Sequence, residues 1–290
     1  MAAIGDCPEA PAWALRASAS GAAGACAQVF TEVVRDPGGC DAATLGAGTR
    51  DAFLRAFARL RTSAWPTPAR VWAFLPNIHE RVGEDSNRYE VFNAGRFEAF
   101  VQMLGSAERF AGALPAASCV GHFGRHLVVH AMGVTGAVEH VENPRQVPAI
   151  EYSRKFGPRP PCFARGTVAE FGGVRRLVIS GTASVRGEDS AHGADLAEQL
   201  RETAANLAAV VQAANARGGA VVGRGVGWFA EGEFESLRVY VPRGVEEDAV
   251  RAGVERVGPP LRAAEPVEFV RAEVCRAELL VEIEGTVVAR

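Results

Sequence analysis

The chain alternates between amphipathic stretches that predict helices and short apolar runs that predict strands. Apolar residues recur every three or four positions over 194–217, which marks one buried helix face, and Gly218 follows as a stop signal. The same spacing predicts helices over 52–60, 88–104 and 245–257. The helices of the second half are long enough to cover one face of a sheet.

Short β-branched runs between these helices predict strands, several of which end at a glycine or a proline. The second half of the chain reads as β-β-α-β-α-β, an order that predicts an α+β fold. The first half has a similar element content, which leaves a divergent internal duplication open. We therefore expect one domain over residues 1–142 and a second over residues 143–290. Strands are predicted over 27–34, 71–75, 127–133, 176–180, 237–241 and 279–284.

The overall composition argues against several classes of function. Hydrophobic residues make up 48% and charged residues 22% of the 290 positions, as in ordinary soluble globular proteins. The formal net charge is −3, so no overall field favours a nucleic acid or a membrane surface. The N-terminus lacks the apolar run of a signal peptide, and no stretch approaches the ~20 apolar residues of a membrane span. We expect a cytoplasmic protein with neither a nucleic-acid nor a membrane partner.

The positions of cysteine, lysine and histidine further restrict the possible reaction types and metal sites. The 6 cysteines are scattered without a Cys-x-x-Cys pair, which favours reduced thiols over disulfides or a zinc site. Lys155 is the only lysine, so Schiff-base chemistry would depend on it. His122, His126 and His130 are spaced by four, but their neighbours indicate a turn and strands, and no carboxylate completes a metal site. The glycine-rich residues 223–227 precede no helix, so they are not interpreted as a nucleotide-binding loop.

The segment 143–166 (NPRQVPAIEYSRKFGPRPPCFARG) combines arginines with several prolines. Because proline fixes φ and has no N–H, we predict an extended connector that is neither a helix nor a central strand. Guanidinium groups are suited to clamping carboxylates, since their planar fork donates two parallel hydrogen bonds. The alternative is a surface linker with solvated arginines, and spacing alone favours neither. The side chains concerned are Arg145, Tyr152, Arg154, Arg159 and Arg165.

Glu282 and Glu284 are two positions apart in a predicted strand, so their side chains share one face while Val281 and Ile283 share the other. A carboxylate on a sheet face beside a core is costly unless it is paired or protonated. A carboxyl group that is protonated near neutral pH is what a general acid requires. The more common alternative is a strand face in solvent. Cys275, seven residues before Glu282, is by itself more typical of a buried small apolar residue than of a reactive thiol.

Several long segments of the sequence resemble the chorismatase family, whose catalytic half has the fold of the small RidA/YjgF-like proteins. The segments follow the family's order and span most of the chain. Two features depart from the family pattern: Ile150 stands where an aromatic residue is expected, and the region before residue 50 is short. The resemblance implies a RidA/YjgF-like (chorismate-mutase-like) catalytic domain over 143–290, preceded by a related or divergent α+β domain. The matching segments are RYEVFNAGR (88–96), ENPRQVPAIEYSRKFGPRPPCFARG (142–166), LVISGTAS (177–184), GEDSAHGAD (187–195), QLRETAANL (199–207) and VCRAELLVEIEG (274–285).

The resemblance implies hydrolytic removal of the enolpyruvyl side chain of chorismate, which releases pyruvate without a metal or an organic cofactor. Glu282 matches the family's acid, which would protonate the methylene carbon of the vinyl ether and give an oxocarbenium ion. Glu284 would support this acid or face water. Because chorismate is a dicarboxylate, the resemblance implies that the arginines of the segment 143–166 bind its carboxylates. The expected carboxylate-binding residues are Tyr152, Arg154, Arg159 and Arg165.

Two further residues bear on the product that the family resemblance implies. The group that forms 3-hydroxybenzoate carries a glycine in the SGTAS turn and a cysteine before the last strand, as Gly181 and Cys275 do here. We therefore expect a 3-hydroxybenzoate synthase in which Gly181 and Cys275 act with Glu282. One alternative is a hydrolase that leaves a dihydroxycyclohexadiene carboxylate. Another is a non-catalytic, RidA-like carboxylate-binding protein with a solvated Glu282, which a raised pKa of Glu282 would argue against.

The resemblance also bears on assembly, because RidA-like proteins are trimers with sites between subunits. Here the additional N-terminal half could take the place of a neighbouring subunit, so we expect a monomer. The site would then lie between the two halves or along the C-terminal sheet. In addition, Arg88 or Arg96 could contribute to this site.

Overall fold

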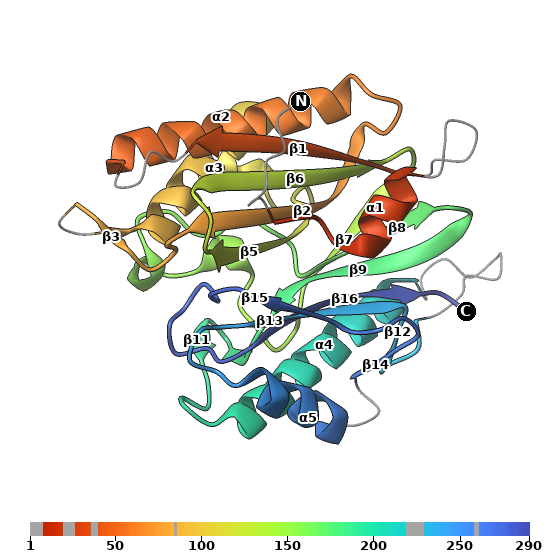
Figure 1. The fold of residues 1–290 in the computed structure, drawn as a ribbon. Coiled ribbons are helices and arrows are strands. Elements are labelled where there is room, and N and C mark those ends of the chain that lie inside the picture. The colour runs from red at the N-terminus through yellow and green to blue at the C-terminus, as the bar shows by residue number, and fades with distance from the viewer. Residues whose placement is uncertain (1–7, 20–26, 36–39, 84–85, 219–228, 258–260) are drawn as a thin grey trace.

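Two β-sheets pack face to face, and helices cover their outer faces (Figure 1). The computed structural model describes residues 8–19, 27–35, 40–83, 86–218, 229–257 and 261–290. The first sheet has the strand order β1-β6-β2-β5, and the second has the order β15-β13-β16-β9-β8-β7. The α+β class expected from the sequence is therefore confirmed.

The first sheet and the helices on its outer face come from the first half of the chain. Phe53 of α2 meets Phe92 and Phe100 of α3 with ring centroids 5.9 and 6.0 Å apart, and these rings fill the space between the helices and the sheet. Helix α3 begins with a capping box, in which Asn87 and Glu90 each accept the other's backbone N–H. The elements are α1 (Ala12–Ala19), β1 (Ala27–Arg35), α2 (Ala42–Arg61), β2 (Thr67–Pro76), β3 (Arg81–Val82), β4 (Ser86–Asn87), α3 (Arg88–Leu104), the short 3₁₀ helix η1 (Ala107–Arg109), β5 (Ala116–His122) and β6 (His126–Val134).

The second sheet carries α4 and α5 on its outer face, where Leu200, Leu207 and Val254 pack against strand residues such as Val239 and Ile283. Strand β7 precedes residue 143 yet pairs with β8 at the edge of this sheet, so membership of the second sheet begins before the predicted boundary. The division into 1–142 and 143–290 stays a prediction. The elements are β7 (Val138–Val141), η2 (Ala149–Glu151), η3 (Arg154–Phe156), β8 (Gly166–Phe171), β9 (Val174–Thr182), β10 (Val185–Arg186), β11 (Asp189–Ser190), α4 (Leu196–Gly218), β12 (Glu233–Phe234), β13 (Ser236–Val241), α5 (Glu247–Val257), β14 (Arg262–Ala263), β15 (Glu268–Arg271) and β16 (Glu282–Val288).

The inner faces of the two sheets share an apolar core. Trp72 and Phe74 of β2 and Val128 of β6 belong to the same buried cluster as Val178 of β9 and Tyr240 of β13, and all five side chains are almost completely buried. Burial of large apolar side chains is the main stabilising term between such layers. This packing brings the inward-facing residues of β2 and β5 against those of β9 and β16.

Most predicted elements are confirmed, and the exceptions have clear causes. Helix α3 has the predicted bounds, but the strand predicted over 279–284 is wrong in its first half, because β16 begins only at Glu282. In the residues before β16, the backbone N–H of Leu280 donates to the side chain of Gln199 on α4 instead of pairing with a neighbouring strand. Strand β5 was not predicted because every one of its residues is buried, so no alternation marks it.

The arginine-proline segment is a connector, as predicted. Residues 143–165, all of which the structure describes, contain the two three-residue 3₁₀ turns η2 and η3 and isolated β-bridges at Gln146 and Ala164, but neither an α-helix nor a strand. Its end is fixed to the first sheet, since the backbone N–H of Ala164 donates to the carbonyl of Pro115 at 3.2 Å. The segment is therefore tied to the first sheet immediately before β5, and it leads directly into β8 of the second sheet.

Candidate active site

A cavity of about 420 Å³ opens beside the C-terminal end of β9, a size suited to a small organic molecule. Its walls come from the region between β2 and α3 with the start of α3, the arginine-proline connector, the end of β9 with the residues after it, and the residues before β16 with the first residue of β16. Both halves of the chain thus contribute to it. The lining residues that matter below are Asn87, Tyr89, Glu90, Gln146, Tyr152, Lys155, Phe156, Phe163, Arg165, Gly181, Ala183, Val185, Cys275, Arg276, Glu278 and Glu282.

Glu282 is a buried carboxyl group at the bottom of this cavity. Its side chain lies on the inner face of β16 and the residue is 5% exposed, so the alternative of a solvent-facing strand is wrong. Burial raises the pKa of Glu282 to about 8, the negative charge of Glu284 adds to the rise, and Arg70 opposes it. Glu282 is therefore protonated at neutral pH, the state required of a general acid.

Glu284 lies on the same face of β16 and is held by donors from the first sheet. Its carboxylate accepts hydrogen bonds from Arg70 (2.8 Å), Trp72 (2.8 Å) and Ser118 (2.5 Å). Arg70 and Glu284 are both almost fully buried. The two glutamates thus share a face but differ in environment: Glu284 is paired, whereas Glu282 faces the cavity. Such divergence between neighbouring carboxyl groups is typical of acid–base sites.

Gly181 separates the cavity from Ser118. Its backbone N–H donates to Ser118 Oγ at 2.8 Å. A Cβ built on Gly181 would overlap Oε1 of Glu282 and would lie 2.7 Å from its Cδ and 2.9 Å from Ser118 Oγ. Glycine is needed here for close approach between side chain and backbone, since any larger residue would displace the Glu282 carboxyl group.

Cys275 lies in the cavity wall near Glu282. Burial raises the pKa of the Cys275 thiol to about 11, with a further rise from the charge of Glu282, against which Arg276 and a hydrogen bond with Tyr89 act. The group is therefore a neutral thiol at physiological pH rather than a nucleophilic thiolate. A neutral thiol can still donate a weak hydrogen bond or exclude water from one side of a ligand.

Tyr152 and Arg165 are held together at the cavity wall. Arg165 donates from Nη2 to the hydroxyl of Tyr152 at 2.9 Å and to the carbonyl of Val147 at 3.0 Å. Its guanidinium carbon lies 5.0 Å from the ring centroid of Phe163. The Nε of Arg165 is buried without a partner, so this guanidinium keeps donor capacity for a ligand.

The other predicted arginines lie elsewhere. Arg154 and Arg159 are exposed, and neither lines the cavity; Arg159 stacks over the ring of Phe97 at 4.8 Å. Their role in binding a carboxylate stays a prediction. Arg88 and Arg96 are buried in α3 and do not reach the cavity either.

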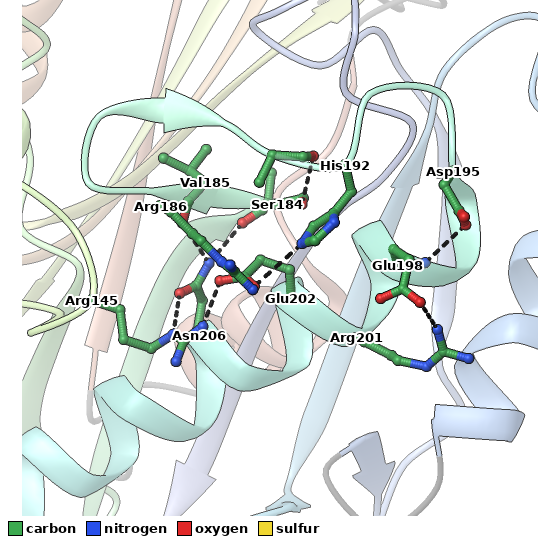
Figure 2. Close-up of polar contacts among 12 residues, drawn as sticks. Arg145, Ser184, Val185, Arg186, His192, Asp195, Glu198, Arg201, Glu202 and Asn206 are labelled. Atoms are coloured by element: carbon green, nitrogen blue, oxygen red, sulfur yellow. Dashed lines mark hydrogen bonds and ion pairs between the residues drawn. The ribbon is translucent and has the colours of Figure 1, made fainter.

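Helix α4 holds the cavity wall that follows β9 (Figure 2). Glu202 accepts hydrogen bonds from Arg145 at 2.6 Å and from Arg186 at 2.8 Å. Asn206, one turn further along α4, donates to the carbonyls of Ala183 (3.1 Å) and Val185 (2.9 Å), both of which line the cavity. Arg145 of the connector is therefore committed to this network and positions backbone, not ligand.

The three histidines spaced by four lie in strands, as their neighbours indicated. His122 donates from Nε2 to the carbonyl of His126 at 2.6 Å, while His130 bonds Thr31 at 2.8 Å and the carbonyl of Pro8 at 2.9 Å. Within the described ranges, no group of three or more His, Cys, Asp or Glu side chains is arranged to hold a metal. The glycine-rich residues 223–227 lie outside the described residues.

Sequence reasoning did not single out Arg70, Ser118, Tyr89 or Arg276 as site residues. Arg70 and Ser118 are 214 and 166 positions from Glu284, and nothing local in the sequence marks their approach to it. Arg276 directly follows Cys275 within the segment that resembles the chorismatases, which is the signal that could have identified it.

The fold and cavity define a two-sheet α+β protein with a protonated carboxyl group facing a small-molecule site. A family model described as "Chorismatase FkbO/Hyg5-like, N-terminal" matches residues 18–133. A "3-hydroxybenzoate synthase" of Streptomyces hygroscopicus is 34% identical over 245 residues, which are 82% of this chain and 68% of that protein. The chain belongs to the chorismatase FkbO/Hyg5-like family, as its motifs predicted, and is a chorismatase-family enzyme.

A solved structure of a relative agrees with this assignment. A crystal structure of a chorismatase at 1.08 Å resolution has a TM-score of 0.75 and 29% identity, and the match covers 89% of this chain and 74% of that one. The YjgF gene product of E. coli matches 52% of this chain and 98% of its own, at 23% identity and a TM-score of 0.34. Among the described residues, no helix is both long and apolar enough to cross a membrane.

Proposed function

We propose that this protein cleaves chorismate to pyruvate and 3-hydroxybenzoate, with Glu282 as the general acid. The observation that carries the proposal is the placement of Glu282: a buried carboxyl group at the cavity, with a pKa of about 8, next to a glycine that leaves room for this carboxyl group. The product follows from Gly181 and Cys275, and the relative named 3-hydroxybenzoate synthase supports it.

The first step is protonation of the methylene carbon of the enolpyruvyl group by Glu282, which gives an oxocarbenium ion and a Glu282 carboxylate. General acid catalysis of this kind contributes roughly 10²–10⁴ in rate. The neighbouring Glu284 carboxylate raises the pKa of Glu282, and this keeps Glu282 protonated at neutral pH until the substrate is bound. The Glu284 carboxylate is held in place by hydrogen bonds from Arg70, Trp72 and Ser118, so it can act on the pKa of Glu282 without changing its position.

The second step decides the product. If the ring's own hydroxyl group takes part, the atoms of chorismate equal those of pyruvate plus 3-hydroxybenzoate, and no water is consumed overall. If water attacks instead, one water is consumed and a dihydroxycyclohexadiene carboxylate remains. The apolar wall of Ala183 and Val185, together with the neutral thiol of Cys275, limits the access of water to the bound ring. This wall supports the first route.

Substrate binding is assigned to Tyr152 and Arg165, which meet at the cavity wall with one donor of Arg165 unused. Arg154 and Arg159 remain candidates for guiding an anion toward the entrance from the protein surface. The cavity takes residues such as Tyr89 from the first half and Glu282 from the second half of a single chain. We therefore also propose that the monomer is active, which light scattering under assay conditions tests.

The experiment that tests the function is incubation of the purified protein with chorismate and no added metal. Pyruvate is followed by a coupled assay, and the ring product is identified by mass spectrometry. Equal amounts of pyruvate and 3-hydroxybenzoate are expected. Pyruvate with a non-aromatic diol would retain the acid and overturn the product assignment. Binding of chorismate without turnover would instead favour a carboxylate-binding protein of the same fold.

A further inference from the structure

A stripe of buried polar side chains on helix α4 reaches the cavity wall without lining the cavity. It consists of Gln199, Glu202, Thr203 and Asn206, which share one face because residues three or four positions apart on a helix lie together. All four belong to the described part of the chain, and none of them lines the cavity. A buried polar side chain is costly unless it is hydrogen-bonded, so the partners of this stripe indicate its role.

Two stretches of the cavity wall lie outside the two large sheets. Residues 183–185, the post-β9 wall, lead into β10, which within the described chain pairs only with β11. The described residues 278–280, the pre-β16 wall, belong to no strand. Ala183, Val185 and Leu279 of these stretches line the cavity. Because buried backbone groups need hydrogen-bond partners, the position of both stretches depends on contacts outside the sheets.

Asn206 holds the post-β9 wall. Its Nδ2 donates to the carbonyls of Ala183 (3.1 Å) and Val185 (2.9 Å), and its Oδ1 accepts from Nε of Arg145 at 3.1 Å. Because a guanidinium group can only donate, it determines which end of the amide faces Arg145 and which end faces the wall. The amide therefore has one orientation, and both wall carbonyls are tied to α4 (Figure 2).

Gln199 holds the pre-β16 wall in a similar way. Its Oε1 accepts the backbone N–H of Leu280 at 2.8 Å, and its Nε2 donates to the carbonyl of Glu278 at 2.9 Å. A carboxamide has the donor and the acceptor of a peptide group, so Gln199 takes the place of a neighbouring strand at these residues. This contact fixes the backbone two positions before Glu282, the first residue of β16.

We propose that Gln199 and Asn206 are positioning residues of the active site, with separate effects on the reaction. Asn206 keeps the post-β9 wall closed against water and so acts on the choice of product. Gln199 fixes the segment that leads into Glu282 and so acts on the rate of proton transfer. The inference rests on the function proposed above, in which this wall excludes water and Glu282 is the general acid. Both side chains act through the backbone that they hold.

The first test compares N206A with N215A, a matched control on the same helix. Asn215 also holds backbone through its amide, since it donates to the carbonyl of Phe229 and accepts its N–H, both at 2.8 Å, but Phe229 lies outside the cavity. N206A is expected to raise the ratio of diene diol to 3-hydroxybenzoate about 5- to 10-fold, with kcat for pyruvate release within about threefold of the wild type. N215A should lower the Tm without changing this ratio. An unchanged ratio in folded N206A, or the same shift in N215A, would overturn the role of Asn206.

N206S provides the test if N206A does not fold. Serine keeps one hydroxyl donor in place of the two N–H donors of the amide. The ratio of diol to 3-hydroxybenzoate is therefore expected to lie above that of the wild type, and below that of N206A where both variants fold. If N206A does not fold, a wild-type ratio in N206S would count against the role of Asn206 in product choice.

The second test compares Q199M with Q212M. Methionine keeps the length of the glutamine side chain but has no strong donor or acceptor, and Gln212 is an exposed residue of the same helix. Q199M is expected to lower kcat for pyruvate release about 10- to 100-fold with KM changed less than about threefold, because a displacement of about 1 Å at the acid has an effect of this size. Q199E keeps an acceptor for the Leu280 N–H and should retain part of kcat. Q212M should behave as the wild type. An unchanged kcat in Q199M, or a change in KM alone, would overturn the role of Gln199.

Amide hydrogen exchange separates failure of the inference from failure of the proposed function. If the wild type releases no pyruvate from chorismate, or leaves only the diol, the proposed function fails, and exchange followed by mass spectrometry then tests the positioning alone. N206A should speed exchange about 10-fold or more in peptides that cover 183–191, and Q199M should do so in peptides that cover 276–282. N215A and Q212M should leave both regions unchanged. Wild-type exchange in N206A and Q199M, or the same increase in all four variants, would overturn the inference.

Discussion

A Cβ on Gly181 would overlap the Oε1 atom of Glu282, so a residue at the end of β9 and the first residue of β16 meet without space for a methyl group. The hydrogen bond from the Gly181 N–H to Ser118 Oγ, at 2.8 Å, limits movement of the backbone away from the glutamate. The position of the acid therefore depends on a glycine about a hundred residues before it in the chain.

Gly181→Ala should change both rate and product. The added methyl group displaces the Glu282 carboxyl group, and a displacement of about 1 Å at a reacting group is worth about 10²-fold in rate. We expect pyruvate release to slow by about 10- to 100-fold and the diene diol to increase relative to 3-hydroxybenzoate. G136A is the matched control, since an exposed turn glycine with free space around it tolerates the same change. Unchanged rate and product in G181A would contradict the geometry.

Glu282→Gln should abolish most turnover while leaving substrate binding intact. Glutamine has the shape of glutamic acid but cannot give up a proton to carbon, so the loss of pyruvate release is expected to be about 10²–10⁴-fold. The measurement is single-turnover pyruvate release at saturating chorismate. Glu255→Gln, an exposed change on α5, controls for the loss of a carboxyl group elsewhere. A loss below about tenfold would mean that another group is the acid.

The rate should fall as the pH rises through about 8, where Glu282 loses its proton. The sign follows from the active form: burial and the charge of Glu284 raise the pKa, so the protonated acid persists above neutral pH and disappears beyond that value. E284Q removes the neighbouring charge and leaves Arg70, so it should move this decline in kcat/KM to lower pH. A decline that stays in place in a folded E284Q variant would show that the two carboxyl groups do not interact.

Cys275→Ala is expected to shift the product toward the diene diol with pyruvate release largely retained. Because burial raises the pKa of the thiol to about 11, the residue acts as a neutral group that assists ring proton or hydroxyl transfers and excludes water, and alanine does only part of this. Mass spectrometry of the ring product measures the ratio. C40A, a cysteine outside the cavity, should leave the mixture unchanged. The same mixture in C275A and the wild type would refute a role for the thiol.

Arg70→Met should destabilise the protein by about 3–5 kcal/mol, because it leaves the Glu284 carboxylate buried without its cation. Trp72 and Ser118 still donate to Glu284, but neither carries a charge. Urea unfolding measures the change in free energy. The double variant R70M/E284Q should recover part of the loss, since no unpaired charge then remains. If the double variant loses as much free energy of unfolding as the two single variants together, direct coupling between Arg70 and Glu284 is excluded.

The sequence by itself determined the local secondary-structure elements and which side chains are available for catalysis. The spacing of apolar residues predicted α3 with its observed bounds, and prolines predicted a connector over 143–166. Strand alternation placed Glu282 and Glu284 on one face, opposite Val281 and Ile283, and the structure has this arrangement. These features follow from interactions between residues close in sequence, which periodicity and propensity describe.

Only the tertiary structure decided what covers that face. A period of two shows that Glu282 and Glu284 point the same way, but solvent and a second sheet give the same pattern. The pairing of Glu284 with Arg70 joins residues 214 positions apart on two different sheets. The contact of Gly181 with Glu282 depends on the pairing of β9 with β16, which are distant in the sequence. The raised pKa of Glu282 arises from that burial and that neighbour. Desolvation depends on the three-dimensional surroundings of a group, so it has no signature in the order of residues.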